Sequence, residues 1–317
     1  MQVFHICRIH PKEKNHILSG TFGHTSRPVQ THMLESAKRK GVEKLTHSAN
    51  RTFNSSIKID VLIPAIEKDL GTLPYVIDSI RTQVKHPIGK IMVVSPPSKR
   101  IQALCRRKNC TFINEKRVLP ITKKDIRYQT KRTNRSGWLL QQLLKLAGGN
   151  LTKRKYYLVI DADTILIRPH VFLVNGKTVF YCRNWSRPEY FRTYKKLLGT
   201  KPTASRSFVA HYMLFDKSKL SRLKWKIEAR HKTRWYWAII KKTNKQSYAG
   251  FSEFETYGNF VKAHYPGHLV ARSALNKSCS STPASLTREQ LFRMAQKYRS
   301  ISFHKRRWYI RKTGLRK

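Results

Sequence analysis

The first half of the chain alternates between short apolar runs and amphipathic stretches. The apolar runs are rich in β-branched residues and predict buried strands at 57–66, 90–94, 111–114 and 156–160. The amphipathic stretches have apolar residues at helical spacing and predict helices at 69–84, 98–108 and 137–146, with a basic loop at 116–135. This order predicts an α/β fold, with a mixed, mostly parallel sheet flanked by helices.

The second half is less regular. Strands are predicted at 179–182, 208–215 and 300–304, and helices at 188–198, 219–230, 235–242, 251–264 and 287–299. Residues 1–55 lack sustained periodicity and are rich in His, Lys, Arg, Ser and Thr. We therefore expect a basic, poorly ordered N-terminal arm over 1–55 and one folded domain over 56–312.

The charge balance limits the choice of partners. The 317 residues include 65 Lys and Arg against 17 Asp and Glu, a net charge of +48. Such a chain is attracted to polyanions or to an anionic membrane surface, so peripheral contact with either is expected as a hypothesis. No apolar run of 18 residues and no signal-peptide core occurs, which predicts a cytoplasmic location with peripheral membrane attachment as a further option.

The scarcity of acidic residues draws attention to Asp161-Ala162-Asp163, which directly follows the apolar run 156–160. Two carboxylates at i and i+2 on a strand point to the same face, and at a strand end both can reach one ion. Mg2+ and Mn2+ prefer oxygen ligands and also bind phosphate oxygens. The pattern therefore favours a metal and diphosphate site, although a simple Asp-rich turn would have the same sequence.

Four motifs in this order resemble a known group of enzymes. They are Gly137-Trp138 with Gln141-Gln142, Asp161 with Asp163, His211-Tyr212-Met213, and the run from Ser252 to Gly258, SEFETYG. Over roughly residues 57–305 the chain is similar to GT-A-type glycosyltransferases with a DxD motif. In detail it is similar to a poorly characterised glycosyltransferase-like family that combines these motifs.

The resemblance implies transfer of a sugar from a nucleotide-sugar donor, such as a UDP- or GDP-sugar, to a glycan or other hydroxyl acceptor. It implies a divalent metal, Mn2+ or Mg2+, held by Asp161, Asp163 and His304. It also implies a donor-binding group of residues at strand ends, on the Trp-Gln helix and near the C-terminus: Pro64, Glu67, Arg135, Trp138, Gln141, Asp161, His211 and Lys305. For His211 a core role in its apolar run stays open, and for His304 and Lys305 a basic tail does.

Glu253 and Glu255 are the candidate catalytic residues on the acceptor side. A carboxylate can deprotonate an acceptor hydroxyl, and Glu253 is favoured for this role. Glu255 is the second candidate, or it contacts the acceptor. Ser252 and Glu255 also match a helix capping box, Ser-x-x-Glu, so a purely structural role is equally open.

Other functions compete with sugar transfer. The high charge and the aromatic residues among basic ones, as at 233–242, suit binding of single-stranded nucleic acid. No helix-turn-helix, zinc-finger, RRM or KH signature occurs, so specific nucleic-acid recognition is not expected. A nucleotidyltransferase or an inactive binding relative could share the α/β half and the aspartates.

Overall fold

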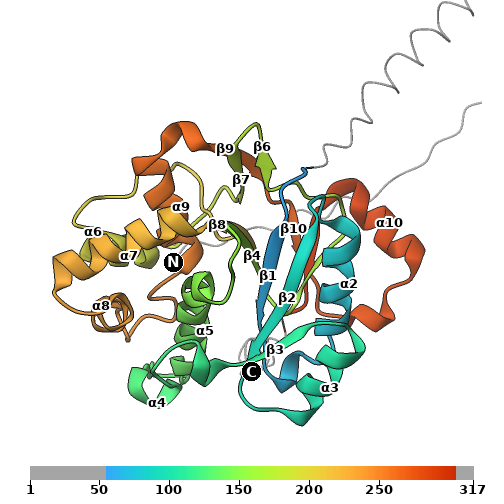
Figure 1. Ribbon diagram of the computed structural model, residues 1–317, viewed down its shortest axis with the longest axis horizontal. Coiled ribbons are helices and arrows are strands. Elements are labelled where there is room, and N and C mark those ends of the chain that lie inside the picture. Colours follow the sequence, from blue (N-terminus) through green and yellow to red (C-terminus); the bar gives the residue numbers. More distant parts are fainter. Residues whose placement is uncertain (1–54, 305–317) are drawn as a thin grey trace, which may run out of the picture. The chain divides into compact units, whose positions relative to one another are not determined.

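The computed structural model describes residues 55–304. Its centre is a five-stranded sheet in the order β3-β2-β1-β4-β8. The strands of this sheet are β1 (Ile59–Pro64), β2 (Ile88–Ser95), β3 (Thr111–Asn114), β4 (Tyr156–Ile160) and β8 (Tyr212–Asp216). Four of them run parallel, and β8 pairs antiparallel with β4. Figure 1 shows this sheet between helices on both sides.

The side chains of the central strands alternate between two buried clusters. From β1, Val61 and Ile63 join one cluster, whereas Leu62 joins the other. The first cluster is completed by α2 (Leu73–Gln83) and α3 (Lys99–Arg107), and the second by α5 (Ser136–Ala147) together with the helices of the second half. The sheet is therefore buried on both faces, which explains the continuous apolar runs of its strands.

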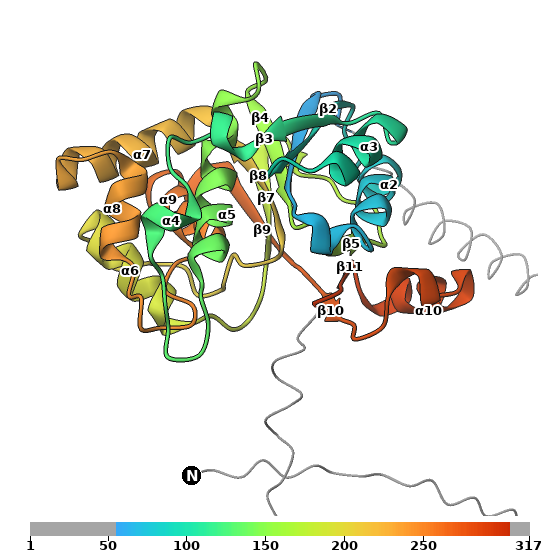
Figure 2. The same ribbon diagram turned by 90° about the horizontal axis from the view of Figure 1, so that it is seen from below.

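The second half adds helices and two small sheets (Figure 2). Its helices are α6 (Pro188–Leu198), α7 (Lys217–His231), α8 (Trp235–Lys242), α9 (Glu253–His264) and α10 (Arg288–Lys297), and a short α4 (Lys123–Ile126) precedes α5. One three-stranded sheet joins β10 (Asn276–Ser278), β11 (Ser300–Ser302) and β5 (Thr164–Leu166). The other joins β6 (Leu173–Val174), β7 (Lys177–Cys182) and β9 (Leu269–Ser273).

The predicted α/β fold with a mixed, mostly parallel sheet is confirmed. The short strands β5, β6, β9 and β10 were not predicted, and two further differences have a local cause. The interval 116–135 contains the helix α4, which Thr122 caps by accepting the Lys124 N–H at 3.2 Å. The strand predicted at 208–215 begins only at Tyr212, because His211 adopts a left-handed backbone with φ of 68°, which interrupts an extended chain. The predicted N-terminal arm lies outside the described residues.

Candidate metal and nucleotide site

The candidate site lies where β1 and β4 end side by side. β1 leads through α2 to β2 on one side, while β4 lies on the other, so the strand order reverses between β1 and β4. Ligands of open α/β sheets bind beyond the carboxyl ends of the strands at such a switch point. Asp161 follows β4 directly at this point, and Gln141 of α5 reaches across to β1 by donating from Nε2 to the Pro64 carbonyl at 3.4 Å.

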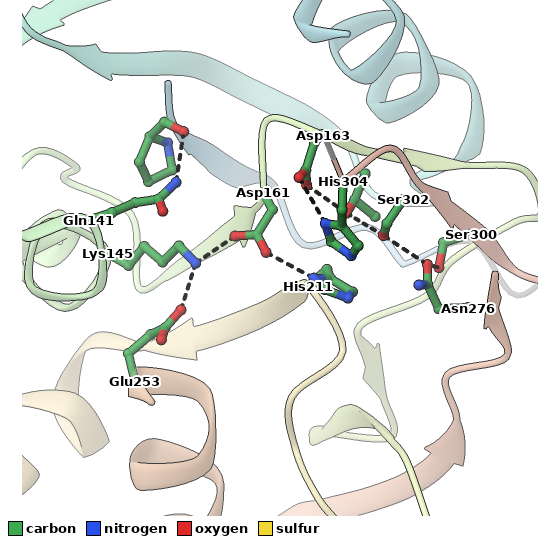
Figure 3. A network of polar contacts seen from close by, with 12 residues as sticks. Gln141, Lys145, Asp161, Asp163, His211, Glu253, Asn276, Ser300, Ser302 and His304 are labelled. Carbon is green, nitrogen blue, oxygen red and sulfur yellow. Dashed lines mark hydrogen bonds and ion pairs between the residues drawn. The ribbon is translucent and has the colours of Figure 1, made fainter. Parts of the chain in front are cut away.

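Asp161 is held from two directions, as Figure 3 shows. Lys145, on α5, places its Nζ 2.5 Å from Asp161 Oδ1 and 2.7 Å from Glu253 Oε1, at the start of α9. On the other side, His211 Nδ1 lies 3.0 Å from Asp161 Oδ2. Lys145 is only 2% exposed, so this ion-pair cluster joins α5, β4 and α9 inside the protein. We call Asp161, Lys145, Glu253 and His211 the inner cluster.

In the inner cluster, the Lys145 ammonium contacts two carboxylates. Burial alone would lower the pKa of Lys145, but Asp161 and Glu253 raise it above its ordinary value. Burial raises the pKa of Asp161, yet Lys145 and His211 outweigh it and hold that pKa well below the usual range. Burial raises the pKa of Glu253, and Lys145 offsets it only in part. Asp161 is therefore the carboxylate that Lys145 keeps ionised most firmly.

His211 completes the inner cluster in its neutral form. Burial lowers its pKa, although the contact with Asp161 raises it. The Arg183 guanidinium donates to His211 Nε2, so Nδ1 carries the proton that is donated to Asp161. The peptide N–H of Asp161 also donates to the His211 carbonyl at 2.9 Å. His211 thus contacts Asp161 through both its side chain and its backbone. Its left-handed backbone is of the kind that clusters at functional sites.

Asp163 lies two residues after Asp161 and has its own histidine partner. His304 Nδ1 lies 3.1 Å from Asp163 Oδ2, and the Phe303 N–H donates to the Asp163 carbonyl at 2.8 Å. The small β10-β11-β5 sheet fixes this segment, because β11 precedes His304 and pairs antiparallel with β5. The side chains of Asp163 and His304 are 29% and 22% exposed. We call these two residues the outer pair.

The predicted metal ligands Asp161, Asp163 and His304 are therefore not gathered into one set. Within residues 55–304, no group of three His, Cys, Asp or Glu side chains is placed to hold a metal ion. The reason is local: the Thr164 N–H donates to the Asp161 carbonyl at 3.1 Å, which closes a turn. In a turn the alternation of a strand no longer applies, and the two carboxylates contact different histidines, His211 and His304, whose ring centres are 5.0 Å apart.

The outer pair nevertheless fits a divalent ion. Two neighbouring ligands of an octahedral ion at roughly 2.1 Å are about 3.0 Å apart. Asp163 Oδ2 and His304 Nδ1, which here form a hydrogen bond of 3.1 Å, already lie at about this spacing, and both side chains are partly open to solvent. Asp161 does not fit in the same way, because Lys145 and His211 occupy both of its carboxylate oxygens.

Glu253 and Glu255 are both only 1% exposed. Glu253, the favoured base, is not free, because Lys145 binds it and Gln142, with its amide nitrogen turned toward the carboxylate, donates to Oε1 at 3.2 Å. Glu255 does not close the predicted capping box. Its Oε2 instead accepts the Ser207 hydroxyl at 2.6 Å and the Phe208 N–H at 3.2 Å. Glu253 thus belongs to the inner cluster, and Glu255 anchors the 207–208 segment.

The rest of the SEFETYG motif packs the second half together. The Tyr257 hydroxyl accepts the Asp216 N–H at 2.9 Å and so ties α9 to the end of β8. Gly258 allows Phe208 to approach α9, since a Cβ at this position would lie 2.2 Å from the Phe208 ring. These residues therefore have a structural reason to be Tyr and Gly.

Several predicted donor-binding residues lie away from Asp161. Glu67, beyond β1, accepts the Ser98 hydroxyl at 2.6 Å at the start of α3. Arg135 stands before α5 with its guanidinium 4.2 Å from the Trp138 ring and 4.1 Å from the Tyr248 ring. Burial lowers the pKa of Arg135, although neighbouring tyrosines offset this in part. Lys305 lies outside the described residues.

Lys145 and Arg183 were not among the predicted site residues. The only signal for Lys145 was its position within GWLLQQLLKL, where leucines surround it and Gln142 lies one helical turn before it. A lysine in an amphipathic helix usually reaches solvent, so this signal is weak. Nothing in the sequence near Arg183 distinguishes it from the many other arginines.

Comparison with known proteins identifies the family. The chain belongs to DUF6492, a family of unknown function, whose family model matches residues 57–302. No curated protein matches the chain.

Solved structures of glycosyltransferases are similar at a low level. The galactosyltransferase LgtC, in complex with donor and acceptor sugar analogues, is 12% identical, with 77% of this chain and 87% of that chain covered and a TM-score of 0.42. Mouse xyloside xylosyltransferase 1 is 12% identical, with 78% and 97% covered and a TM-score of 0.42. Glucosyl-3-phosphoglycerate synthase from Mycobacterium tuberculosis, in complex with Mn2+, UDP and glucosyl-3-phosphoglycerate, is 18% identical, with 64% and 69% covered and a TM-score of 0.31. At these values the likeness carries no information on substrate or residue roles.

No helix between residues 55 and 304 is long and apolar enough to cross a bilayer.

Proposed function

We propose that the protein is a metal-dependent glycosyltransferase that moves a sugar from a nucleoside diphosphate sugar to a hydroxyl acceptor. The observation that carries the proposal is the outer pair, Asp163 and His304, which lies beyond β4 at the switch point of a mostly parallel sheet. The family resemblance of the four motifs supports the same function.

In this proposal Asp163 and His304 hold the divalent ion, and Asp161 joins them only if its contact with His211 is exchanged. The bound ion would supply positive charge to a departing nucleoside diphosphate. Gln141, attached to the Pro64 carbonyl, would border the nucleotide at the end of β1. The basic side chains near the site, Arg183 above all, would attract the diphosphate.

The inner cluster has a positioning role in this proposal. Lys145 fixes the Asp161 carboxylate at 2.5 Å, and Glu253 holds the other side of the ammonium at 2.7 Å. Glu253 would act as the base only after a movement that separates it from Lys145, so we assign it to positioning Asp161. Glu255, bound to Ser207 and Asn259, shapes the segment that leads to His211.

A panel of UDP- and GDP-sugars tests the proposal. With Mn2+ or Mg2+ present, at least one donor should release nucleoside diphosphate, and a chelator should stop the release. Release of pyrophosphate instead would indicate a nucleotidyltransferase. The Asp163→Asn variant should lose the activity, whereas the surface control Asp78→Asn, which only loses its contact with Lys108 at 2.6 Å, should keep it. If no donor in the panel is cleaved with either metal, the proposal is contradicted.

A further inference from the structure

Beside the inner cluster, the segment after β7 encloses a small cavity. Its wall includes Arg183, Trp185, Arg187, Tyr190 and Ser207. The cavity offers about 30 Å³ of space to the centres of water-sized molecules. Pockets that enclose a whole small molecule measure roughly 300–1,000 Å³. The cavity therefore suits one small chemical group, with the rest of a ligand outside it.

The cavity is one side chain away from the proposed donor site. Arg183 lines it and also donates to His211, which in turn contacts Asp161. Ser207, whose backbone pairs with that of Arg183, binds the buried Glu255 at 2.6 Å. Tyr190 interacts electrostatically with Arg187 and Arg135 as well as with Glu253, although burial is the main reason that its pKa is raised to about 12. A group in this cavity would thus lie beside the reacting centre.

The lining has the chemistry of a site for an anion attached to a ring. Two of its side chains, Arg183 and Arg187, carry positive charge, and no acidic side chain belongs to the lining. Glu255 lies behind Ser207 and is only 1% exposed, so it does not line the cavity, although its charge and that of Glu253 act on Tyr190 in the wall. Guanidinium groups bind carboxylates and phosphates through paired hydrogen bonds. An oxyanion is therefore the group that this cavity favours.

An aromatic side chain stands at the same place. Trp185 is 58% exposed, and the Arg183 guanidinium lies 5.4 Å from the centre of its ring. An exposed indole ring offers a flat apolar face against which a ligand ring can pack. A sugar ring carrying an anionic group could place that group between the arginines and rest its own face on Trp185.

We propose that this cavity is the acceptor subsite and that it selects an acceptor sugar bearing a phosphate or carboxylate near the accepting hydroxyl. The inference rests on the proposed glycosyltransferase function and deepens it by naming the chemical class of the acceptor. The donor's own diphosphate is the competing occupant, and the experiment separates the two.

The test compares three ligands on the full-length protein: glucose 6-phosphate, glucuronate and neutral methyl glucoside. Binding is followed by calorimetry at physiological salt, because a chain of charge +48 attracts any anion at low salt. The two anionic sugars should bind saturably, and methyl glucoside should not. Arg187→Gln should weaken their binding by roughly tenfold to a hundredfold, the range of a lost charge-assisted hydrogen bond. Trp185→Ala should weaken it too.

The chain offers a matched control elsewhere on its surface. On α7, Arg222 lies 4.3 Å from the ring of Trp225, which is 53% exposed. Arg222→Gln and Trp225→Ala remove the same chemical groups, and both should leave anionic-sugar binding unchanged. If the control pair weakens binding as much as the cavity pair, the binding is general charge attraction and the inference is overturned.

Nucleotide binding in the presence of Mn2+ is measured in parallel. If wild-type protein binds UDP or GDP but none of the anionic sugars at millimolar concentration, the acceptor inference fails while the proposed function stands. If UDP or GDP displaces glucose 6-phosphate competitively, the cavity belongs to the donor and the inference is again overturned. If no nucleotide binds at all, the proposed function itself fails.

Discussion

Asp161 and Asp163 are two residues apart, yet their side chains have different partners. In the inner cluster, both carboxylate oxygens of Asp161 are bound, one by Lys145, which is 2% exposed, and the other by the neutral His211. In the outer pair, Asp163 accepts a hydrogen bond from the Thr164 hydroxyl at 3.4 Å and contacts His304, which is itself partly exposed. The difference teaches that the two carboxylates of one short acidic motif can be bound differently: a buried ammonium holds Asp161, whereas Asp163 contacts a histidine and a threonine.

The largest expected effect concerns the inner cluster. Lys145→Met leaves Asp161 and Glu253 buried without a positive partner, so the free energy of unfolding should fall by about 3–5 kcal/mol. Urea denaturation measures this change. The surface variant Lys108→Met, which loses an ion pair with the half-exposed Asp78, should cost less than about 1 kcal/mol. Equal losses for the two variants would show that the inner cluster is no more critical than a surface ion pair.

A buried histidine that belongs to neither the inner cluster nor the outer pair provides a reference for the neutral His211. His170 is fully buried, with Nδ1 donating to the Arg168 carbonyl at 2.7 Å and Nε2 accepting from the Tyr212 hydroxyl at 3.0 Å. Burial lowers its pKa from 6.5 to about 3. Because the folded-state pKa is the lower one, its contribution to stability is present above pH 6.5 and is lost as the pH falls toward 3.

Lowering the pH from 7 to 5 should therefore reduce the free energy of unfolding by about 2 kcal/mol through His170. Urea denaturation at both pH values measures it, and His170→Gln should flatten the pH dependence by that amount. An unchanged slope in the variant would mean that His170 is not the neutral, buried group that the structure describes. His211, whose pKa is also lowered by burial, should act in the same direction.

The smallest expected effect on stability belongs to the outer pair. Asp163→Asn removes one partly exposed contact with His304, so the free energy of unfolding should change by less than about 1 kcal/mol. The same urea titration as for Lys145→Met gives the value. A loss as large as that of Lys145→Met would show that the outer pair matters as much for stability as the inner cluster.

The sequence predicted the layers of the fold well. The strands at 111–114 and 156–160 and the helices at 188–198 and 235–242 were predicted to the residue, because their apolar periodicity and their bounding residues agree. The strand at 208–215 was predicted too long, since a single left-handed residue, His211, is held by contacts with Asp161 that are distant in sequence. Periodicity carries no information on such contacts.

The residues of the candidate site were more predictable than the geometry of their side chains. Asp161, Asp163, His211, Glu253 and His304 do meet at one end of the sheet, as the order of motifs suggested. The direction of the two carboxylates was not predictable, because it depends on a turn and on the buried Lys145. A lysine among leucines becomes an ion-pair centre only when α9 and the end of β4 are packed against it.

The most direct test is a calorimetric titration of UDP and GDP with and without Mn2+, on the wild-type protein and on Asp163→Asn. We expect one nucleotide to bind wild type only when the metal is present, and at 100 times its dissociation constant to stabilise the fold by about 2.7 kcal/mol. Asp163→Asn should fold normally and lose this binding. Metal-independent nucleotide binding, or binding that survives Asp163→Asn, would contradict the assignment of Asp163 to the metal and nucleotide site.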